Sequence, residues 1–348
     1  MSTNRLLLST CALLLLNACA GSTLQAPFGQ MAQPGRNSPR FLGQSASQPA
    51  HRIENLVNQA RMQKRLAVLS GHSPMGPNDT IPERGTVQGR AMTRAYLTQN
   101  LEALGYTVEP HAYRNNGTNI TTRLMAEKPT DEYIVIGAHL DSVRNPGADD
   151  NASGSTAVLE LATILRELPN RQVNVLFAWF DEEELGLIGS RYLASDLRKQ
   201  GMKISSMHNI DMLGWDGDGD GAVELAQPDG ILWGYYNMVN ETHGLKLPLV
   251  RTNTGQSDHE SFKRNGFHAL CISEEYTRRD TTPHYHRRTD TFSTINFDYL
   301  ASSTRLVAAA VGDLLLKVPP PPGVQFVPHD NFPSRPREFH ASYDEHIH

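Results

Sequence analysis

The residues of this chain that could do chemistry are histidines and carboxylates placed at the ends of apolar, strand-like segments. The fragments are His139-Leu140-Asp141, the loop 147–154, the acidic run Asp181 to Glu184, Asp211, and the late segment 283–291. Carboxylates that converge in one pocket repel each other strongly unless cations offset their charge. Imidazole and carboxylate groups without a thiolate motif are typical of zinc in a catalytic site. The combination therefore favours a metal centre.

Each fragment taken singly is weak. A histidine after a strand is more often a hydrogen-bonded structural residue than a ligand, and an acidic run is more often a solvated face. A serine nucleophile is not indicated, because Ser190 follows Gly189 in a Gly-x-x-Gly-Ser run, which is not a nucleophile elbow.

The elements that must position these groups alternate along the chain. Apolar spacing predicts helices at 53–69, 86–105, 153–168, 191–199, 231–243, 259–265 and 296–316. Strand-like runs are predicted at 107–113, 119–126, 133–138, 173–180, 204–210 and 267–272. This alternation predicts an α/β three-layer sandwich around a mixed, mostly parallel sheet. In such sheets ligands bind at the carboxyl ends of the strands, where the polar fragments lie.

The fragments in combination resemble the co-catalytic dizinc aminopeptidases of the bacterial leucyl aminopeptidase type, a superfamily shared with glutamate carboxypeptidases and glutaminyl cyclases. The resemblance runs from about Gly85 to Leu316. The matching motifs are His139-Leu140-Asp141-Ser142, Gly147-Ala148-Asp149-Asp150-Asn151-Ala152-Ser153-Gly154, Glu183-Glu184-Leu185-Gly186-Leu187 with Gly189-Ser190, Asp211-Met212, and His286-Arg287-Arg288-Thr289-Asp290-Thr291.

The resemblance implies two Zn²⁺ per chain and assigns their ligands. Asp149 is expected to bridge both ions. His139 and Asp211 are expected to complete one site, and Glu184 and His286 the other. Ions about 3.5–4 Å apart are a known arrangement for hydrolysis. The implied function is removal of N-terminal residues from peptides by a metal-dependent exopeptidase.

The resemblance also assigns residues that do not bind metal. Glu183 is expected to be the general base, and Asp141 to accept the free imidazole proton of His139. A cis peptide is expected between Asp149 and Asp150, as in the family. The late segment offers His284 as well as His286, and only the spacing from His286 to the Asp-Thr pair matches the family.

Other functions stay open on the same fold. A carboxypeptidase or dipeptidase would use the same metal motifs, because other residues read the ends of the substrate. A glutaminyl cyclase would use one zinc. A non-catalytic binding lipoprotein is a further alternative.

The two ends of the chain do not look like parts of the fold. Arg5, the apolar run 6–16 and Cys19 resemble a lipoprotein signal over residues 1–18, with a lipid on Cys19. This predicts an exported protein anchored at the outer membrane, the cell surface or in the periplasm. Residues 19–50 are expected to be a flexible tether, 51–317 the zinc peptidase catalytic domain, and 318–348 an extended tail rich in proline and histidine.

Composition excludes some partners. The formal net charge is −5 and no basic block stands out, so nucleic acid is not an expected partner. Of three cysteines only Cys271 lies outside the N-terminal segment, which predicts a fold without an internal disulfide. A turn with Asp216, Asp218 and Asp220 resembles the first half of a calcium-binding loop, but position twelve is Gln227 rather than Glu.

Overall fold

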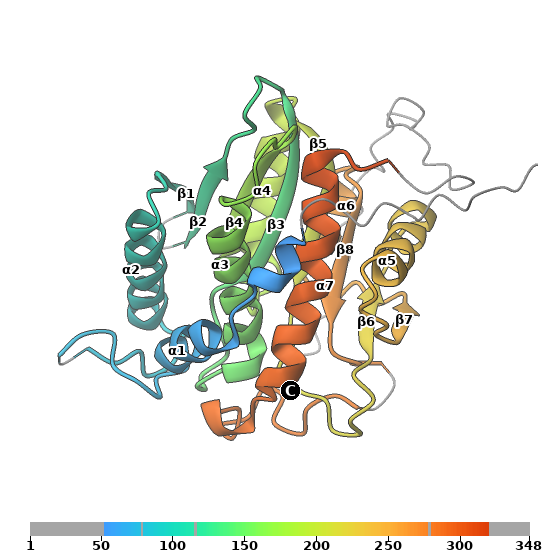
Figure 1. The fold of residues 1–348 in the computed structure, drawn as a ribbon. Coiled ribbons are helices and arrows are strands. Elements are labelled where there is room, and N and C mark those ends of the chain that lie inside the picture. The colour runs from blue at the N-terminus through green and yellow to red at the C-terminus, as the bar shows by residue number, and fades with distance from the viewer. Residues whose placement is uncertain (1–51, 78, 115–116, 278–279, 320–348) are drawn as a thin grey trace, which may run out of the picture. The chain divides into compact units, whose positions relative to one another are not determined.

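The structure, a computed structural model, describes residues 52–77, 79–114, 117–277 and 280–319, all within one compact unit. Its centre is an eight-stranded sheet with the strand order β1-β2-β4-β3-β5-β8-β6-β7 (Figure 1). The strands β4, β3, β5 and β8 run parallel to one another, and antiparallel pairings join them to β2 and to β6. The sheet is mixed and mostly parallel, as predicted.

The bounds of the elements are as follows. The strands are β1 (Val108–Arg114), β2 (Gly117–Leu124), β3 (Glu132–His139), β4 (Asn174–Phe180), β5 (Lys203–Ile210), β6 (Val223–Ala226), β7 (Leu249–Thr252) and β8 (Ala269–Ser273). The helices are α1 (Gln59–Leu69), α2 (Val87–Ala103), α3 (Gly154–Leu165), α4 (Ile188–Lys199), α5 (Gly230–Thr242), α6 (His259–Arg264) and α7 (Phe297–Leu316). Three short turns complete the fold: η1 (Ile53–Leu56), η2 (Ala148–Ser153) and η3 (Phe292–Thr294).

Helices cover both faces of the sheet, so the predicted three-layer sandwich is confirmed (Figure 1). Helices α4 and α6 pack on one face through a smaller apolar cluster that includes Leu193 and Phe262. The helices α1, α2, α3, α5 and α7 pack on the other face in a larger cluster. All seven residues of β4 are buried, which explains why its sequence is nearly continuous in apolar residues.

Local sequence signals account for the helix ends. Thr86 caps α2, because its side chain accepts the N–H of Gly89, and Gly105 has a φ of +84° just beyond the helix. The predicted helix at 53–69 is divided in two, because Asn58 caps α1 by accepting the N–H of Arg61. Strands β6 and β7 were not predicted from the sequence.

The parallel strands bring the polar fragments to one edge. His139 is the last residue of β3, and Asp211 follows β5 directly. The acidic run Asp181 to Glu184 follows β4 between them in chain order. Because parallel strands end at the same edge of a sheet, residues far apart in the sequence meet there.

Several predictions fall on residues outside the described ranges. These are the signal at 1–18 with Cys19, the tether at 19–50, and the tail from residue 320 onward. Among the described helices, α7 has the length and hydropathy of a membrane span, and 78% of that stretch is buried within the fold.

Candidate metal centre and active site

Asp150 lies between the two histidines of the cluster at the sheet edge. Its Oδ1 is 3.2 Å from Nε2 of His139, and its Oδ2 is 3.1 Å from Nε2 of His286. Oδ1 of Asp211 is also 3.2 Å from Nε2 of His139, and Oε2 of Glu184 is 3.2 Å from Nε2 of His286. The five side chains therefore form two three-residue groups that share Asp150.

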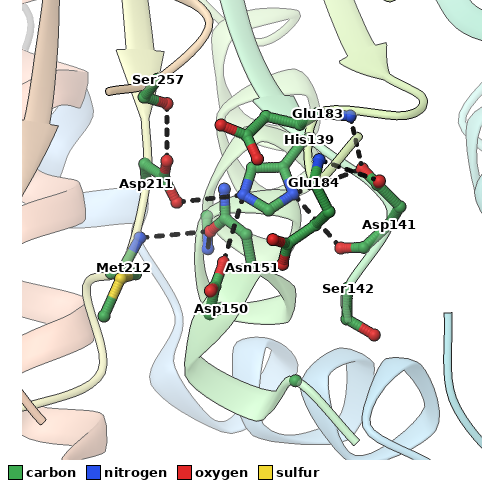
Figure 2. Close-up of polar contacts among 12 residues, drawn as sticks. His139, Asp141, Ser142, Asp150, Asn151, Glu183, Glu184, Asp211, Met212 and Ser257 are labelled. Carbon is green, nitrogen blue, oxygen red and sulfur yellow. Dashed lines mark hydrogen bonds and ion pairs between the residues drawn. The ribbon is translucent and has the colours of Figure 1, made fainter. Parts of the chain in front are cut away.

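The ring of His139 is held from its other side by Asp141 (Figure 2). Nδ1 of His139 is 3.4 Å from Oδ1 of Asp141 and 3.2 Å from the backbone carbonyl oxygen of Asp141. The same carboxylate accepts the backbone N–H groups of Glu183 and Glu184, at 3.1 and 3.2 Å. Asp141 thus orients both the imidazole and the turn that carries the two glutamates. This fits its predicted role, which is to accept the imidazole proton of His139 without binding metal itself.

The prediction that Asp149 bridges the cluster is wrong, because Asp150 rather than Asp149 contacts both histidines. Oδ1 of Asp149 accepts the backbone N–H of Gly214 at 2.7 Å, and its carboxyl is hydrogen-bonded to that of Glu274. Burial raises the pKa of Asp149 to about 7, which favours a proton shared by this buried pair. The cis peptide also lies one residue later than predicted, between Asp150 and Asn151.

Asp290 holds the backbone that presents Asp150. Its two carboxylate oxygens accept the N–H of Asp149 at 2.8 Å and the N–H of Asp150 at 3.1 Å. Asp290 belongs to the same late segment as His286, so this segment supplies one histidine to the cluster and one anchor for its loop. His284 lies apart from the cluster, with Nδ1 2.9 Å from the hydroxyl of Thr289.

Arg84 also anchors this loop, and the sequence analysis did not identify it. Its guanidinium is 1% exposed and donates to the carbonyl oxygens of Leu140 at 3.0 Å, Pro146 at 2.6 Å and Gly147 at 2.7 Å. A fourth bond, of 2.9 Å, reaches the carbonyl of Leu69. No local pattern predicts this role, because the partners are backbone atoms distant in the sequence.

The acidic run after β4 divides into two pairs. Asp181 and Glu182 turn toward arginines: Arg90 lies 2.8 Å from Asp181 and Arg114 lies 2.8 Å from Glu182. Glu183 and Glu184 turn toward the cluster, where Glu183 groups with His139 and Asp211. The two carboxylates that pair with arginines are therefore distinct from the two glutamates that were assigned to the site.

Asp211 is positioned by a chain of hydrogen bonds. Ser257 Oγ donates to its Oδ2 at 2.5 Å (Figure 2). Asn209 Nδ2 in turn donates to Ser257 at 2.7 Å. Ser257 also lines the cavity beside the cluster. His259, which was not assigned as a ligand, is fully buried with Nε2 3.2 Å from the carbonyl oxygen of Thr254, and burial lowers its pKa to about 4.

The electrostatics of the cluster reflect its excess of carboxylates. Burial lowers the pKa of His139, but Asp211 and Glu183 more than reverse this and raise it well above its ordinary value. The hydrogen bonds with Asp150 and Glu184 raise the pKa of His286 to about 10. Burial raises the pKa of Glu183 well above its ordinary value. The cluster therefore favours the uptake of positive charge, either as protons or as bound cations.

The donor set fits divalent zinc. The five groups that converge offer imidazole nitrogen and carboxylate oxygen, and no sulfur. Both histidines direct Nε2 inward, and a carboxylate holds Nδ1 of His139, as is usual for ligating imidazoles. The residues that would hold zinc are His139, Asp150, Glu184, Asp211 and His286.

A narrow cavity of about 60 Å³ opens beside the cluster. It is lined by the cluster residues, by Tyr276 and Tyr285, and by residues of β6 and β8. The ring of Tyr285 stacks on His286 with centroids 3.8 Å apart. A substrate in this cavity would contact the cluster directly.

The acidic turn at 216–220 lies outside this cavity. Asp216 and Asp218 come within 4.8 Å of Asp280, and Asp218 and Asp220 within 4.8 Å of Glu275. Asp218 and Asp220 are exposed, and acidic groups at the surface commonly gather without an ion. Calcium at Asp216, Asp218 and Asp220 stays a prediction.

Comparison with known proteins supports the same picture. Residues 119–311, more than half of the chain, match the model of Peptidase family M28. A probable leucine aminopeptidase of Arthroderma benhamiae is 32% identical over 202 residues, which cover 53% of this chain and 54% of that protein. The chain thus spans about half the length of this relative.

Solved structures share the fold. A zinc aminopeptidase from Bacillus subtilis is 28% identical, with a TM-score of 0.53 over 57% of this chain and 50% of that one. The LapA aminopeptidase of Legionella pneumophila is 20% identical, with a TM-score of 0.67 over 76% and 73%. A glutaminyl cyclase of Bacteroides thetaiotaomicron is 17% identical, with a TM-score of 0.61 over 74% and 98%, so the fold alone does not separate these activities. From the matched motifs and the matched region together, the chain belongs to Peptidase family M28.

Proposed function

We propose that this protein is a zinc-dependent aminopeptidase that hydrolyses the first peptide bond of its substrates. The observation that carries the proposal is the position of Asp150, whose two carboxylate oxygens each lie within 3.2 Å of a different imidazole. Such a carboxylate is suited to bridge two cations. Family membership supports peptide hydrolysis, and the names of the relatives support action at the N-terminus.

The chemistry divides between zinc and the protein. Zinc held by the cluster would lower the pKa of a bound water to roughly 7 and polarise the scissile carbonyl. Glu183 groups with His139 and Asp211 and carries no ion pair to arginine among the described residues. It would take the proton of the attacking water and pass it to the leaving amine. Asp141 would keep Glu183 in place, because its carboxylate accepts the backbone N–H of Glu183.

The test is to replace Glu183 by Gln, which keeps the size of the side chain and removes the base. Turnover of free-amine peptides should fall by about 10²- to 10⁴-fold while bound zinc stays unchanged. Glu167→Gln, which alters an exposed carboxylate, serves as the control and should leave turnover intact. Full activity of the Glu183→Gln enzyme would contradict the mechanism.

Two other activities need separate measurements. Peptides blocked at the N-terminus and at the C-terminus, tested side by side, distinguish an aminopeptidase from a carboxypeptidase or dipeptidase. Formation of pyroglutamate from a peptide with N-terminal Gln would favour a glutaminyl cyclase. Metal analysis of the same sample supports the aminopeptidase if it finds two zinc ions per chain.

We further propose export and anchoring through a lipid on Cys19, which rests on the sequence of residues 1–19 alone. Fatty-acid labelling in cells should mark the wild-type protein and fail for Cys19→Ser. Equal labelling of both proteins would refute the anchor.

A further inference from the structure

One wall of the cavity beside the metal cluster is built from one face of β6 and β8. In the antiparallel register Glu224 pairs with Ser273 and Ala226 pairs with Cys271. Successive residues of a strand point to opposite faces, so these four side chains share one face of the sheet. All four line the cavity. The alternate residues of the same strands are Val223, Leu225, Leu270 and Ile272, which belong to the large apolar core.

Glu224 is the charged residue of this wall, and it is fully buried. Its Oε1 accepts the hydroxyl of Thr252 at 2.6 Å, and its Oε2 accepts the N–H and the hydroxyl of Thr277 at 3.0 and 2.8 Å. All three donors are neutral. Among the described residues, no lysine, arginine or histidine forms an ion pair with this carboxylate.

A buried carboxylate without a cation is costly, even when neutral donors satisfy part of its hydrogen-bonding capacity. An ionised carboxylate offers about four acceptor positions, and three are used here. A cation that entered the cavity could take the remaining position and compensate the charge. A substrate with a cationic side chain could bring such a cation to Glu224.

On the basis of the proposed aminopeptidase activity, we propose that Glu224 makes the enzyme prefer substrates whose N-terminal residue is lysine or arginine. The N-terminal residue lies next to the scissile bond, so its side chain is the part of a substrate that would enter a cavity adjoining the metal cluster. Its ammonium or guanidinium would meet the Glu224 carboxylate at the wall.

The remaining lining of the cavity agrees with a slender, cationic side chain. The wall beside Glu224 is made of small residues, Ala226, Cys271 and Ser273, and offers little apolar surface to a branched leucine side chain. The cavity is narrow, at about 60 Å³. Tyr276 and Tyr285 supply aromatic rings, which favour a nearby cation.

The first experiment compares substrates on the wild-type, zinc-loaded enzyme. Lysyl and norleucyl p-nitroanilides share an unbranched four-carbon stem and differ mainly in the terminal ammonium. We expect kcat/KM for lysine to exceed that for norleucine by roughly 10- to 100-fold, the range of a charge-assisted hydrogen bond. Arginyl and leucyl p-nitroanilides extend the comparison, and leucine should rank below both basic residues.

The second experiment changes the wall. Glu224→Gln should reduce the ratio of kcat/KM for lysine to kcat/KM for norleucine to near unity. Glu241→Gln, on the exposed surface of α5, is the matched control and should keep the wild-type ratio. If Glu224→Gln does not fold, equal or better turnover of norleucine by the wild type would still overturn the inference.

The outcomes separate this inference from the proposed function. Equal or better turnover of norleucine by the wild type would overturn the role of Glu224 and leave the aminopeptidase intact. A lysine preference that survives in a folded Glu224→Gln enzyme would overturn it as well. Failure of the zinc-loaded wild type to cleave any free-amine substrate would instead refute the aminopeptidase itself.

Discussion

Asp149 and Asp150 are neighbours in the chain, yet their carboxylates contact different partners. Asp150 faces the two imidazoles, whereas Asp149 accepts the N–H of Gly214 and shares a hydrogen bond with Glu274. Both backbone N–H groups are held by Asp290. One loop thus presents one carboxylate to the cluster and uses the other to fix its own position.

This difference predicts unequal effects of two matched substitutions. Asp150→Asn should weaken zinc binding by roughly 100-fold or more, because it removes a direct ligand. Asp149→Asn should weaken it by about 10-fold at most, because that residue acts through the loop. Isothermal titration with zinc would measure both. A stronger effect at Asp149 than at Asp150 would contradict the arrangement.

Arg84 predicts a large loss of stability on substitution. Arg84→Met would leave several buried carbonyl groups without donors, at a cost of about 1–3 kcal/mol each for those that water cannot reach. We expect the free energy of unfolding to fall by more than about 3 kcal/mol in urea. Arg198→Met, at an exposed position of α4, should change it by less than about 0.5 kcal/mol. Similar curves for the two variants would disprove the anchoring role.

His243 predicts a dependence of stability on pH away from the metal cluster. Its Nδ1 lies 2.9 Å from Glu54 and its Nε2 lies 3.1 Å from Asp313, so η1, α5 and α7 meet at one buried imidazole. Burial lowers the pKa of His243, but hydrogen bonds to the two carboxylates raise it to about 9. Because the folded-state pKa is the higher one, the stabilisation is complete below about pH 6.5 and is lost as the pH rises to about 9.

The measurement compares the wild type with His243→Gln in urea at about pH 6 and pH 9.5, both with a chelator present. The wild type should lose on the order of 2 kcal/mol more than the variant between the two conditions. The chelator removes any contribution from zinc binding. Parallel losses in both proteins would show that His243 is not the group responsible.

Removal of metal should lower thermal stability as well as activity. Without cations the carboxylates of the cluster repel each other, and bound zinc stabilises the folded state by mass action. We expect Tm to fall by on the order of 5 °C after treatment with a chelator, and to recover with zinc. Calorimetry of both samples tests this. An unchanged Tm would argue against tight binding in the wild type.

The long elements of the fold could be predicted because each carries a repeated signal. Strand β4 is apolar along its whole length, and α2 has both a Thr86 cap and a glycine beyond its end. Strands β6 and β7 have four residues each, too few for an alternating pattern to be recognised. The wall that carries Glu224 was therefore missed together with its strand.

The site was predicted with one error of register. The family resemblance assigned His139, Glu183, Glu184, Asp211 and His286 to one site, and the structure brings these residues together. Two adjacent aspartates have the same side chain, and only the path of the backbone decides which of them faces inward. The role of Arg84 could not be predicted, because its partners are backbone carbonyl groups, which every residue has and which no sequence pattern distinguishes.

The anchoring of the loop by Arg84 bears on how this protein can be shortened. The region that matches the family begins at residue 119, after Arg84. A chain trimmed to the matched region would retain the side chains proposed to bind zinc but lose the guanidinium that donates hydrogen bonds to Pro146 and Gly147. The smallest fragment that keeps this anchor therefore begins upstream of the matched region, at least at α1, because the carbonyl of Leu69 also accepts a hydrogen bond from Arg84.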